Sequence, residues 1–172
     1  MSSQDHTPHH QPHWALADEA ATLQLGAALA PVLVPGLVIH LHGELGAGKT
    51  TLVRGLLRAL GHTGPVKSPT YTLVELYVIS GYSLYHFDFY RFNQPEEWYD
   101  AGLEEHFGGT AICLVEWPEK AGGLSPSPDI EIRLTPDGET RHVSIEGKSE
   151  RGTSCISELR VAVSTPPPAR PT

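Results

Sequence analysis

One stretch of eight consecutive residues has the composition needed to hold the phosphates of a nucleotide. Residues 43–50 read Gly-Glu-Leu-Gly-Ala-Gly-Lys-Thr and match the pattern G-x-x-x-x-G-K-[ST] in full. In such a loop, glycines let backbone N–H groups face a phosphate with no Cβ in the way, and the lysine brings a positive charge to the β- and γ-phosphates. The threonine offers a hydroxyl to Mg²⁺. The pattern predicts a Mg²⁺–nucleotide site formed by Gly43, Glu44, Leu45, Gly46, Ala47, Gly48, Lys49 and Thr50.

Two carboxylates at the ends of predicted strands are candidates for the metal shell. Glu116 comes directly after the apolar run Ala111–Val115, and Asp88 lies in the aromatic segment 85–91. A phosphate-binding loop needs carboxylates that hold the metal's water shell and orient the attacking water, and α/β folds bind ligands at the carboxyl ends of their central strands. We therefore assign catalytic roles to Lys49, Asp88 and Glu116. An acid at a strand end is also often a solvated edge residue, and the sequence leaves open which of the two carboxylates orients the water.

A short loop rich in hydroxyl groups follows the predicted helix of the phosphate loop. Residues 67–71 read Lys-Ser-Pro-Thr-Tyr, and Pro69 restricts Ser68 to an extended conformation. A loop that senses the γ-phosphate should carry Ser or Thr at this place in the chain. We expect residues 68–71 to act as such a switch, with Thr70 near the nucleotide. An ordinary proline turn that leads into a strand is the alternative.

The helices and strands expected around these residues define an α/β fold. Helices are expected at 18–30 and 52–60, and an apolar strand at 36–41 runs directly into the glycine loop. Further expected elements are strands at 73–78, 83–89, 111–115, 130–134 and 142–145, a short helix starting at Pro95 and a last helix at 153–163. The final two strands flank the turn 136–138, which predicts an antiparallel hairpin. We expect a P-loop NTPase-type sheet flanked by helices, with this hairpin at its C-terminal end.

Composition is that of one soluble globular domain. The chain has 172 residues, of which 40% are hydrophobic and 19% charged. We expect residues 13–163 to form the P-loop domain, and the His- and Pro-rich segment 1–12 and the Pro-rich segment 164–172 to be disordered tails. Twenty acidic against 12 basic residues give a net charge of −8. This surplus argues against free-standing binding to nucleic acid, which needs a basic footprint.

The cytoplasm is the expected compartment. Two cysteines are too few for a disulfide framework, and Cys113 lies in an apolar run where a buried, reduced thiol is expected. No stretch approaches the roughly 20 apolar residues of a membrane span, and the first residues do not form a signal peptide. We therefore expect no membrane contact.

Four segments together resemble the TsaE (YjeE) family, the bacterial ATPase of tRNA threonylcarbamoyladenosine biosynthesis. They are residues 42–51, 66–75, 86–91 and 114–118, and their order and spacing agree with the family over about residues 14–147. The resemblance implies that Thr50 and Glu116 ligate Mg²⁺ and that Asp88 supports the metal or the water. Other residues implied to border the nucleotide are Asp18, Thr51, Trp117 and Arg141.

By resemblance, the function is Mg²⁺-dependent ATP hydrolysis that serves the modification of adenosine 37 in tRNAs reading codons that start with A. The expected partner is the TsaB–TsaD heterodimer, and tRNA would be contacted only through that complex. We expect hydrolysis to be weak in the isolated chain and stimulated by the partners. Two alternatives are a small-molecule or nucleoside kinase, against which no Arg-rich lid segment is evident, and a regulatory nucleotide-binding module. The sequence decides neither the preference for ATP over GTP nor the oligomeric state.

Overall fold

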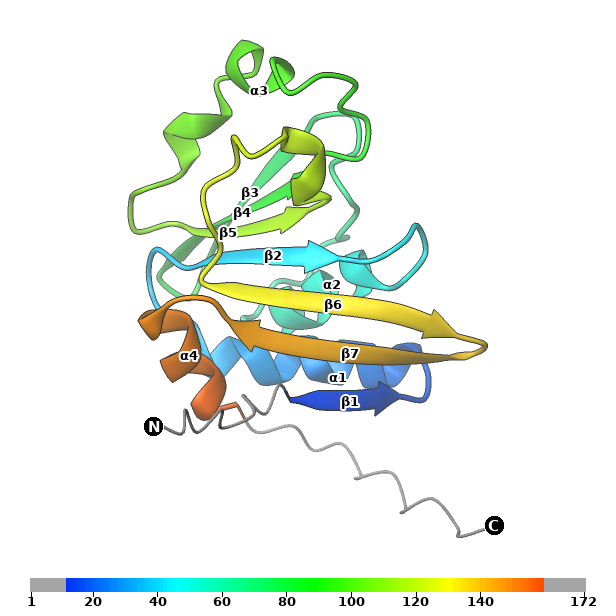
Figure 1. Ribbon diagram of the computed structural model, residues 1–172. Helices are drawn as coiled ribbons and strands as arrows, with labels where there is room; N and C mark the ends of the chain where they lie inside the picture. The colour runs from blue at the N-terminus through cyan, green and yellow to red at the C-terminus, as the bar shows by residue number, and fades with distance from the viewer. Residues whose placement is uncertain (1–11, 160–172) are drawn as a thin grey trace, which may run out of the picture.

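A computed structural model describes residues 12–159, which fold around a seven-stranded sheet (Figure 1). The strands are β1 (His13–Leu16), β2 (Val38–His42), β3 (Val74–Ile79), β4 (Tyr82–Asp88), β5 (Ile112–Glu116), β6 (Ile130–Asp137) and β7 (Thr140–Gly147). Their order across the sheet is β1-β7-β6-β2-β5-β4-β3. Strands β6, β2, β5 and β4 run parallel to one another, whereas β1, β7 and β3 are antiparallel to their neighbours. This arrangement confirms the α/β class and the C-terminal hairpin, which is β6–β7.

Two helices, α1 (Glu19–Leu29) and α2 (Lys49–Ala59), cover one face of the sheet (Figure 1). The helices approach closely because a glycine lies at their crossing: a Cβ on Gly26 would stand 2.1 Å from the carbonyl oxygen of Leu52. Between these helices and the sheet lies an aliphatic core, whose buried members include Leu25, Leu29, Ile39, Leu41, Leu52, Leu56, Ile132 and Ile145. This core fixes α2, and with it the end of the glycine loop, against the sheet.

The opposite face of β4 and β5 is covered by irregular chain with short helices. These are α3 (Glu97–Asp100), η2 (Leu103–His106) and η3 (Pro118–Ala121); η1 (Ala30–Val32) follows α1, and α4 (Glu150–Ser157) follows β7. The core on this face is aromatic. Phe87 stacks on Phe107 with ring centroids 4.8 Å apart, and Trp98 meets Phe89 edge to face at 5.6 Å. These contacts hold the ends of β4 and β5, where the two candidate carboxylates lie.

The sequence missed β1 and misplaced the starts of two helices. β1 has four residues, too few for a periodic pattern, and it exists because it pairs with the outer edge of β7. Helix α2 begins at Lys49 rather than residue 52, because its first turn consists of polar residues, which an apolar pattern does not mark. Helix α4 begins at Glu150 rather than residue 153, because the Ser149 side chain caps it by accepting a hydrogen bond from the Gly152 N–H at 3.0 Å.

The predicted tails and the end of the predicted last helix fall outside residues 12–159, apart from Pro12, and stay predictions. Within that described range, no helix is long and apolar enough to cross a membrane. The longest, α1 and α2, have 11 residues each.

Asp129 ties the start of β6 to β2 and α4, which makes it a test of stability. Its carboxylate accepts hydrogen bonds from the Val38 N–H at 2.9 Å, the Ser149 hydroxyl at 2.7 Å and Arg151 at 2.9 Å. Burial alone would raise the pKa of Asp129, but these donors hold it below its usual value. Asp129→Ala leaves the buried Val38 N–H without this acceptor, whereas the half-exposed Arg151 keeps the carbonyl oxygens of Pro35 and Gly36. We therefore expect the free energy of unfolding at pH 7 to fall by about 1–3 kcal/mol.

The pH dependence of this loss has a definite sign. Because the pKa of Asp129 is depressed in the folded state, its stabilisation is complete above the unfolded carboxyl pKa of about 3.9 and is lost as the pH falls through the folded value. Urea unfolding should therefore show a gap between Asp129→Ala and the parent that shrinks toward pH 3. A gap independent of pH would contradict the assignment. Asp137→Ala, at the exposed end of the hairpin, is the control and should change stability by less than about 0.5 kcal/mol.

Candidate functional site

The glycine loop crosses the carboxyl edge of the parallel strands. It occupies residues 43–48, between the last residue of β2 and Lys49, the first residue of α2. Gly46 and Gly48 have φ angles of +80° and +106°, a left-handed conformation that side chains with a Cβ rarely adopt. The loop thus curls back onto the N-terminus of α2, whose free N–H groups and helix dipole favour an anion.

Strand register brings the two carboxylates to this loop. In the parallel pairing of β2 and β5, Leu41 is the partner of Glu116, and in that of β4 and β5, Asp88 is the partner of Glu116. Three adjacent strands therefore end at one edge, as expected for ligand binding in an open α/β sheet. Glu116 and Asp88 are 3% and 4% exposed, so neither is the solvated edge residue that the sequence left open.

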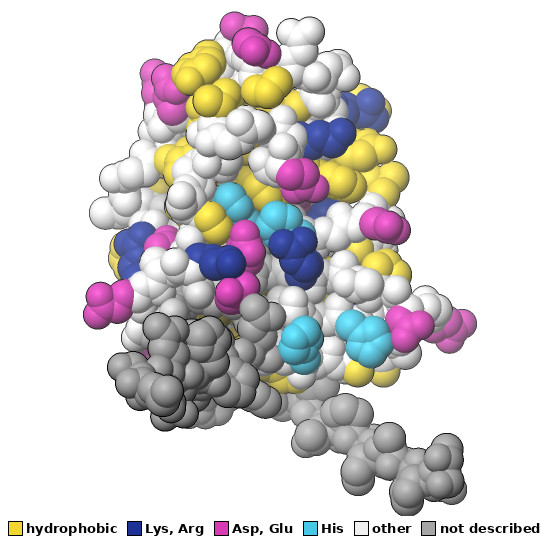
Figure 2. Space-filling view, viewed as in Figure 1, with side chains coloured by type: hydrophobic (Ala, Val, Ile, Leu, Met, Phe, Trp, Pro, Cys, Tyr) yellow, Lys and Arg dark blue, Asp and Glu magenta, His cyan; other side chains and the backbone are white. Residues whose placement is uncertain are grey.

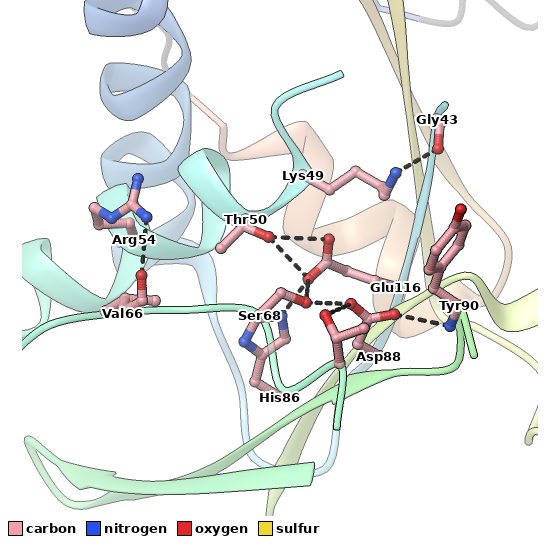
Figure 3. Close-up of polar contacts among 11 residues, drawn as sticks. Gly43, Lys49, Thr50, Arg54, Val66, Ser68, His86, Asp88, Tyr90 and Glu116 are labelled. Carbon is pink, nitrogen blue, oxygen red and sulfur yellow. Dashed lines mark hydrogen bonds and ion pairs between the residues drawn. The ribbon is translucent and has the colours of Figure 1, made fainter. Parts of the chain in front are cut away.

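Lys49 is held over the loop by contacts on both sides of its ammonium group. The group donates a hydrogen bond to the carbonyl oxygen of Gly43 (Figure 3). It also donates to the carbonyl oxygen of Glu44 at 3.0 Å and stands 4.4 Å from the ring centroid of Trp117. Burial lowers the pKa of Lys49, and the nearby carboxylates, first Glu116, offset part of that effect. The charge is thus concentrated where phosphate oxygens would replace the two carbonyl partners.

Hydroxyl groups and carboxylates converge beneath Lys49 (Figure 3). The Thr50 hydroxyl lies 3.2 Å from both carboxylate oxygens of Glu116. The Ser68 hydroxyl lies 3.1 Å from Glu116 and also donates to Asp88, and the Thr70 hydroxyl donates to Asp88 at 3.3 Å. The predicted switch therefore touches both carboxylates, and its sensing role stays a prediction.

This donor set fits Mg²⁺. Thr50, Ser68, Asp88 and Glu116 offer only oxygen atoms, the ligands that this hard cation takes. Two buried carboxylates bridged by one hydroxyl repel each other, and a divalent cation beside them would relieve that repulsion. Thr50 and Glu116, which are in contact with each other, would hold the ion.

A cavity of about 360 Å³ opens over the loop and joins most of the predicted residues. Its lining consists of Leu45, Gly46, Ala47, Gly48, Lys49, Thr50, Thr51, Ser68, Thr70, Asp88, Tyr90, Arg91, Glu116, Trp117 and Arg141. Gly43 and Glu44 line a neighbouring cavity on the β6 side. Asp18 lines neither of these cavities: it is exposed and accepts a hydrogen bond from the Ala21 N–H at 2.9 Å as the N-cap of α1. Its predicted place beside the nucleotide stays a prediction.

A family model matches the region of the chain that runs from before the glycine loop to just beyond Arg141. That model is described as threonylcarbamoyl adenosine biosynthesis protein TsaE, and the match covers residues 16–143. The chain belongs to the TsaE family.

This TsaE-family chain has relatives that it matches over nearly their whole length. Two proteins named "tRNA threonylcarbamoyladenosine biosynthesis protein TsaE" are 42% identical in Haemophilus influenzae and 36% identical in Bacillus subtilis, each over 147 residues. These alignments cover 83% and 85% of this chain and 93% and 92% of the relatives. The crystal structure of YdiB from Bacillus subtilis superposes with a TM-score of 0.74 at 30% identity, covering 87% of this chain and 93% of that one.

The structure of this TsaE-family chain also shows side-chain contacts that the sequence did not predict, made by three residues near the site. Arg91 stacks on Tyr71 of the switch, 4.2 Å from the ring centroid, and donates to its hydroxyl at 3.0 Å. Arg54 holds the approach to the switch by donating to the Val66 carbonyl at 2.8 Å. The most buried of them is His86, whose Nε2 lies 2.7 Å from Glu116. His86 and Asp88 are two residues apart on one strand, so their side chains lie on the same face. That spacing was the signal that could have identified His86.

His86 lowers the pKa of Glu116. Burial would raise the pKa of Glu116, but the hydrogen bond and charge of His86, with smaller contributions from Lys49 and Ser68, hold it below its usual value. His86→Leu removes this partner, so the pKa of Glu116 should rise. In the pH–rate profile of nucleotide hydrolysis, the acid limb, where Glu116 loses its charge, should then move to higher pH. His86→Gln keeps a hydrogen-bond donor and should move the limb less. Identical profiles for both variants and the parent would contradict this role.

Proposed function

We propose that this chain is a Mg²⁺-dependent ATPase required for threonylcarbamoylation of adenosine 37 in tRNAs that read codons starting with A. It is weakly active alone and acts with the TsaB–TsaD transferase, through which it meets tRNA. The names of the relatives support the pathway. The observation that supports the chemistry is the convergence of Lys49, Thr50, Asp88 and Glu116 on one cavity.

Each of these residues has a separable task in phosphoryl transfer. Lys49 exchanges its loop carbonyls for phosphate oxygens and thereby binds the nucleotide. Thr50 and Glu116 hold the Mg²⁺ ion, which neutralises charge on the phosphate oxygens when bound. Asp88 lies one strand further from the loop, where it shares the Ser68 hydroxyl with Glu116 and can orient water. Ser68 and Thr70 can release the carboxylates when a γ-phosphate offers them a new acceptor, which is how the switch would sense it.

Nucleotide turnover with labelled substrate is the experiment that tests this function. [γ-³²P]ATP and [γ-³²P]GTP are incubated with the chain, Mg²⁺ and a panel of nucleosides, with and without TsaB–TsaD. Label released as inorganic phosphate, and more of it with the pair, supports the proposal. Label transferred to a nucleoside supports the kinase instead, and no turnover in any mixture supports the regulatory module.

Lys49→Ala is expected to weaken nucleotide binding by about 10- to 100-fold, the value of a hydrogen bond to a charged group, without unfolding the chain. Alanine is a good helix former at the first position of α2. Calorimetric titration with Mg²⁺–ATP measures the affinity, and thermal unfolding tests the fold. Lys67→Ala removes an exposed lysine that does not line the cavity and is the matched control. Parent-like affinity in Lys49→Ala would contradict the phosphate-binding role.

A further inference from the structure

Two histidines and a glutamate share the sheet face opposite α1 and α2. His40 and His42 alternate along β2, while their neighbours Ile39 and Leu41 point into the aliphatic core under the helices. In the parallel pairing of β2 and β6, Glu131 is the partner of His40. The three side chains therefore project from one face. Figure 2 views that face and shows histidine side chains gathered beside acidic and basic ones in its middle.

The donor atoms of these side chains lie close together on that face. One ligand atom from each of His40, His42 and Glu131 lies within 4.8 Å of the others. His42 Nε2 is 3.6 Å from Glu131 Oε1, too long for a hydrogen bond. Tetrahedral ligands with bonds of about 2.0–2.1 Å to one ion lie about 3.4 Å apart. His42 Nε2 is moreover buried without a hydrogen-bond partner in the described part of the chain.

Surrounding groups orient the three ligands. Glu119 lies 3.5 Å from His42 Nδ1, so a carboxylate stands behind the ring and leaves Nε2 to face the site. Glu131 turns its other oxygen, Oε2, toward Lys148 at 3.7 Å and Arg133 at 3.9 Å, so Oε1 remains for a metal. Lys148 and Arg133 therefore orient Glu131 through Oε2 and leave Oε1, the oxygen that faces His42, available to a metal ion.

His40 makes few contacts that a metal ion would have to displace. The Pro126 backbone accepts a hydrogen bond from its ring, and Ser125 makes a long contact of 3.3 Å to Nε2. A metal would replace only that last contact.

We propose that His40, His42 and Glu131 bind one divalent ion of the zinc class, separate from the Mg²⁺ site. Two imidazoles and one carboxylate favour Zn²⁺, Co²⁺ or Ni²⁺ over Mg²⁺, which prefers oxygen ligands. Three protein ligands leave the fourth position to water or another small ligand.

Calorimetric titration with ZnCl₂ tests the site. The His-rich N-terminal segment is a competing binder, so the full chain carrying His6→Gln, His9→Gln and His10→Gln serves as the reference. We expect it to bind one Zn²⁺ per chain, and millimolar Mg²⁺ not to displace the ion. Adding His42→Gln or Glu131→Gln should weaken binding by at least 10- to 100-fold. Adding His142→Gln should change nothing, because His142 lies at the exposed hairpin end, where it pairs with Asp137 at 3.0 Å.

Thermal unfolding without metal shows whether each variant folds. If His42→Gln does not fold, Glu131→Gln still tests the site, because Glu131 is partly exposed. Loss of Zn²⁺ binding on replacing the N-terminal histidines, or unchanged binding in Glu131→Gln, would overturn the proposal. ATP hydrolysis is not used as the readout, so failure of this site and failure of the proposed ATPase are separate results.

Discussion

In Glu116→Ala, nucleotide should still bind while hydrolysis falls by about 10²-fold or more, because the phosphate loop remains and a charge at the metal is lost. Glu116 is the hub of the polar cluster, since it contacts Thr50, Ser68 and His86. Calorimetric titration with Mg²⁺–ATP gives the affinity, and single-turnover phosphate release gives the chemical step. Weaker dependence on Mg²⁺ concentration should accompany the loss.

Two further variants sharpen this test. Asp88→Asn keeps the size of the side chain and removes the other carboxylate, so unchanged turnover in Glu116→Ala with a large loss in Asp88→Asn would move the metal role to Asp88. Glu119→Ala is the matched control. Glu119 helps to raise the pKa of Lys49, but it does not line the cavity over the glycine loop. We expect it to change hydrolysis less than about threefold, as surface charges commonly do.

Addition of TsaB–TsaD should raise ATP hydrolysis by about 10³-fold, the lower end of what an added arginine finger contributes. The isolated chain has Lys49 fixed at the loop, but Arg91 stacks on the exposed ring of Tyr71 in the switch. A partner that covers Tyr71 would release or redirect this arginine toward the cavity that it already lines. Steady-state phosphate release, measured for the chain alone and with the pair, gives the factor.

The source of the stimulating charge can be located in the same assay. If Arg91 supplies it, Arg91→Ala should lower the stimulated rate far more than the basal one, whereas Arg58→Ala, exposed near the end of α2, should lower neither. If both variants are stimulated like the parent, the partners bring their own cation. A lone chain that already turns over at about 10 s⁻¹, unaffected by the pair, would contradict the partner-stimulated mechanism altogether.

Local chemistry was readable from the sequence. The loop 43–50, the strand before it and the helix after it are contiguous, so their geometry depends on nearest neighbours and on glycine at defined positions. Continuous apolar runs predicted the buried strands, because a parallel strand covered on both faces excludes polar side chains. The ends of β4 and β5 were predicted as well, and with them Asp88 and Glu116 as candidates.

Only the tertiary structure decided which of these residues meet. The pairing of Asp88 with Glu116 depends on the register of β4 and β5, and the contact of His86 with Glu116 depends on the same register. The proximity of His40 to Glu131 requires β6 to lie beside β2, although 87 residues (43–129) lie between the two strands. Strand order is set by the packing of helices and aromatic side chains on the two faces of the sheet, which no local pattern records. Spacing along the chain therefore determined the phosphate loop, and long-range packing determined the buried carboxylate cluster beneath it.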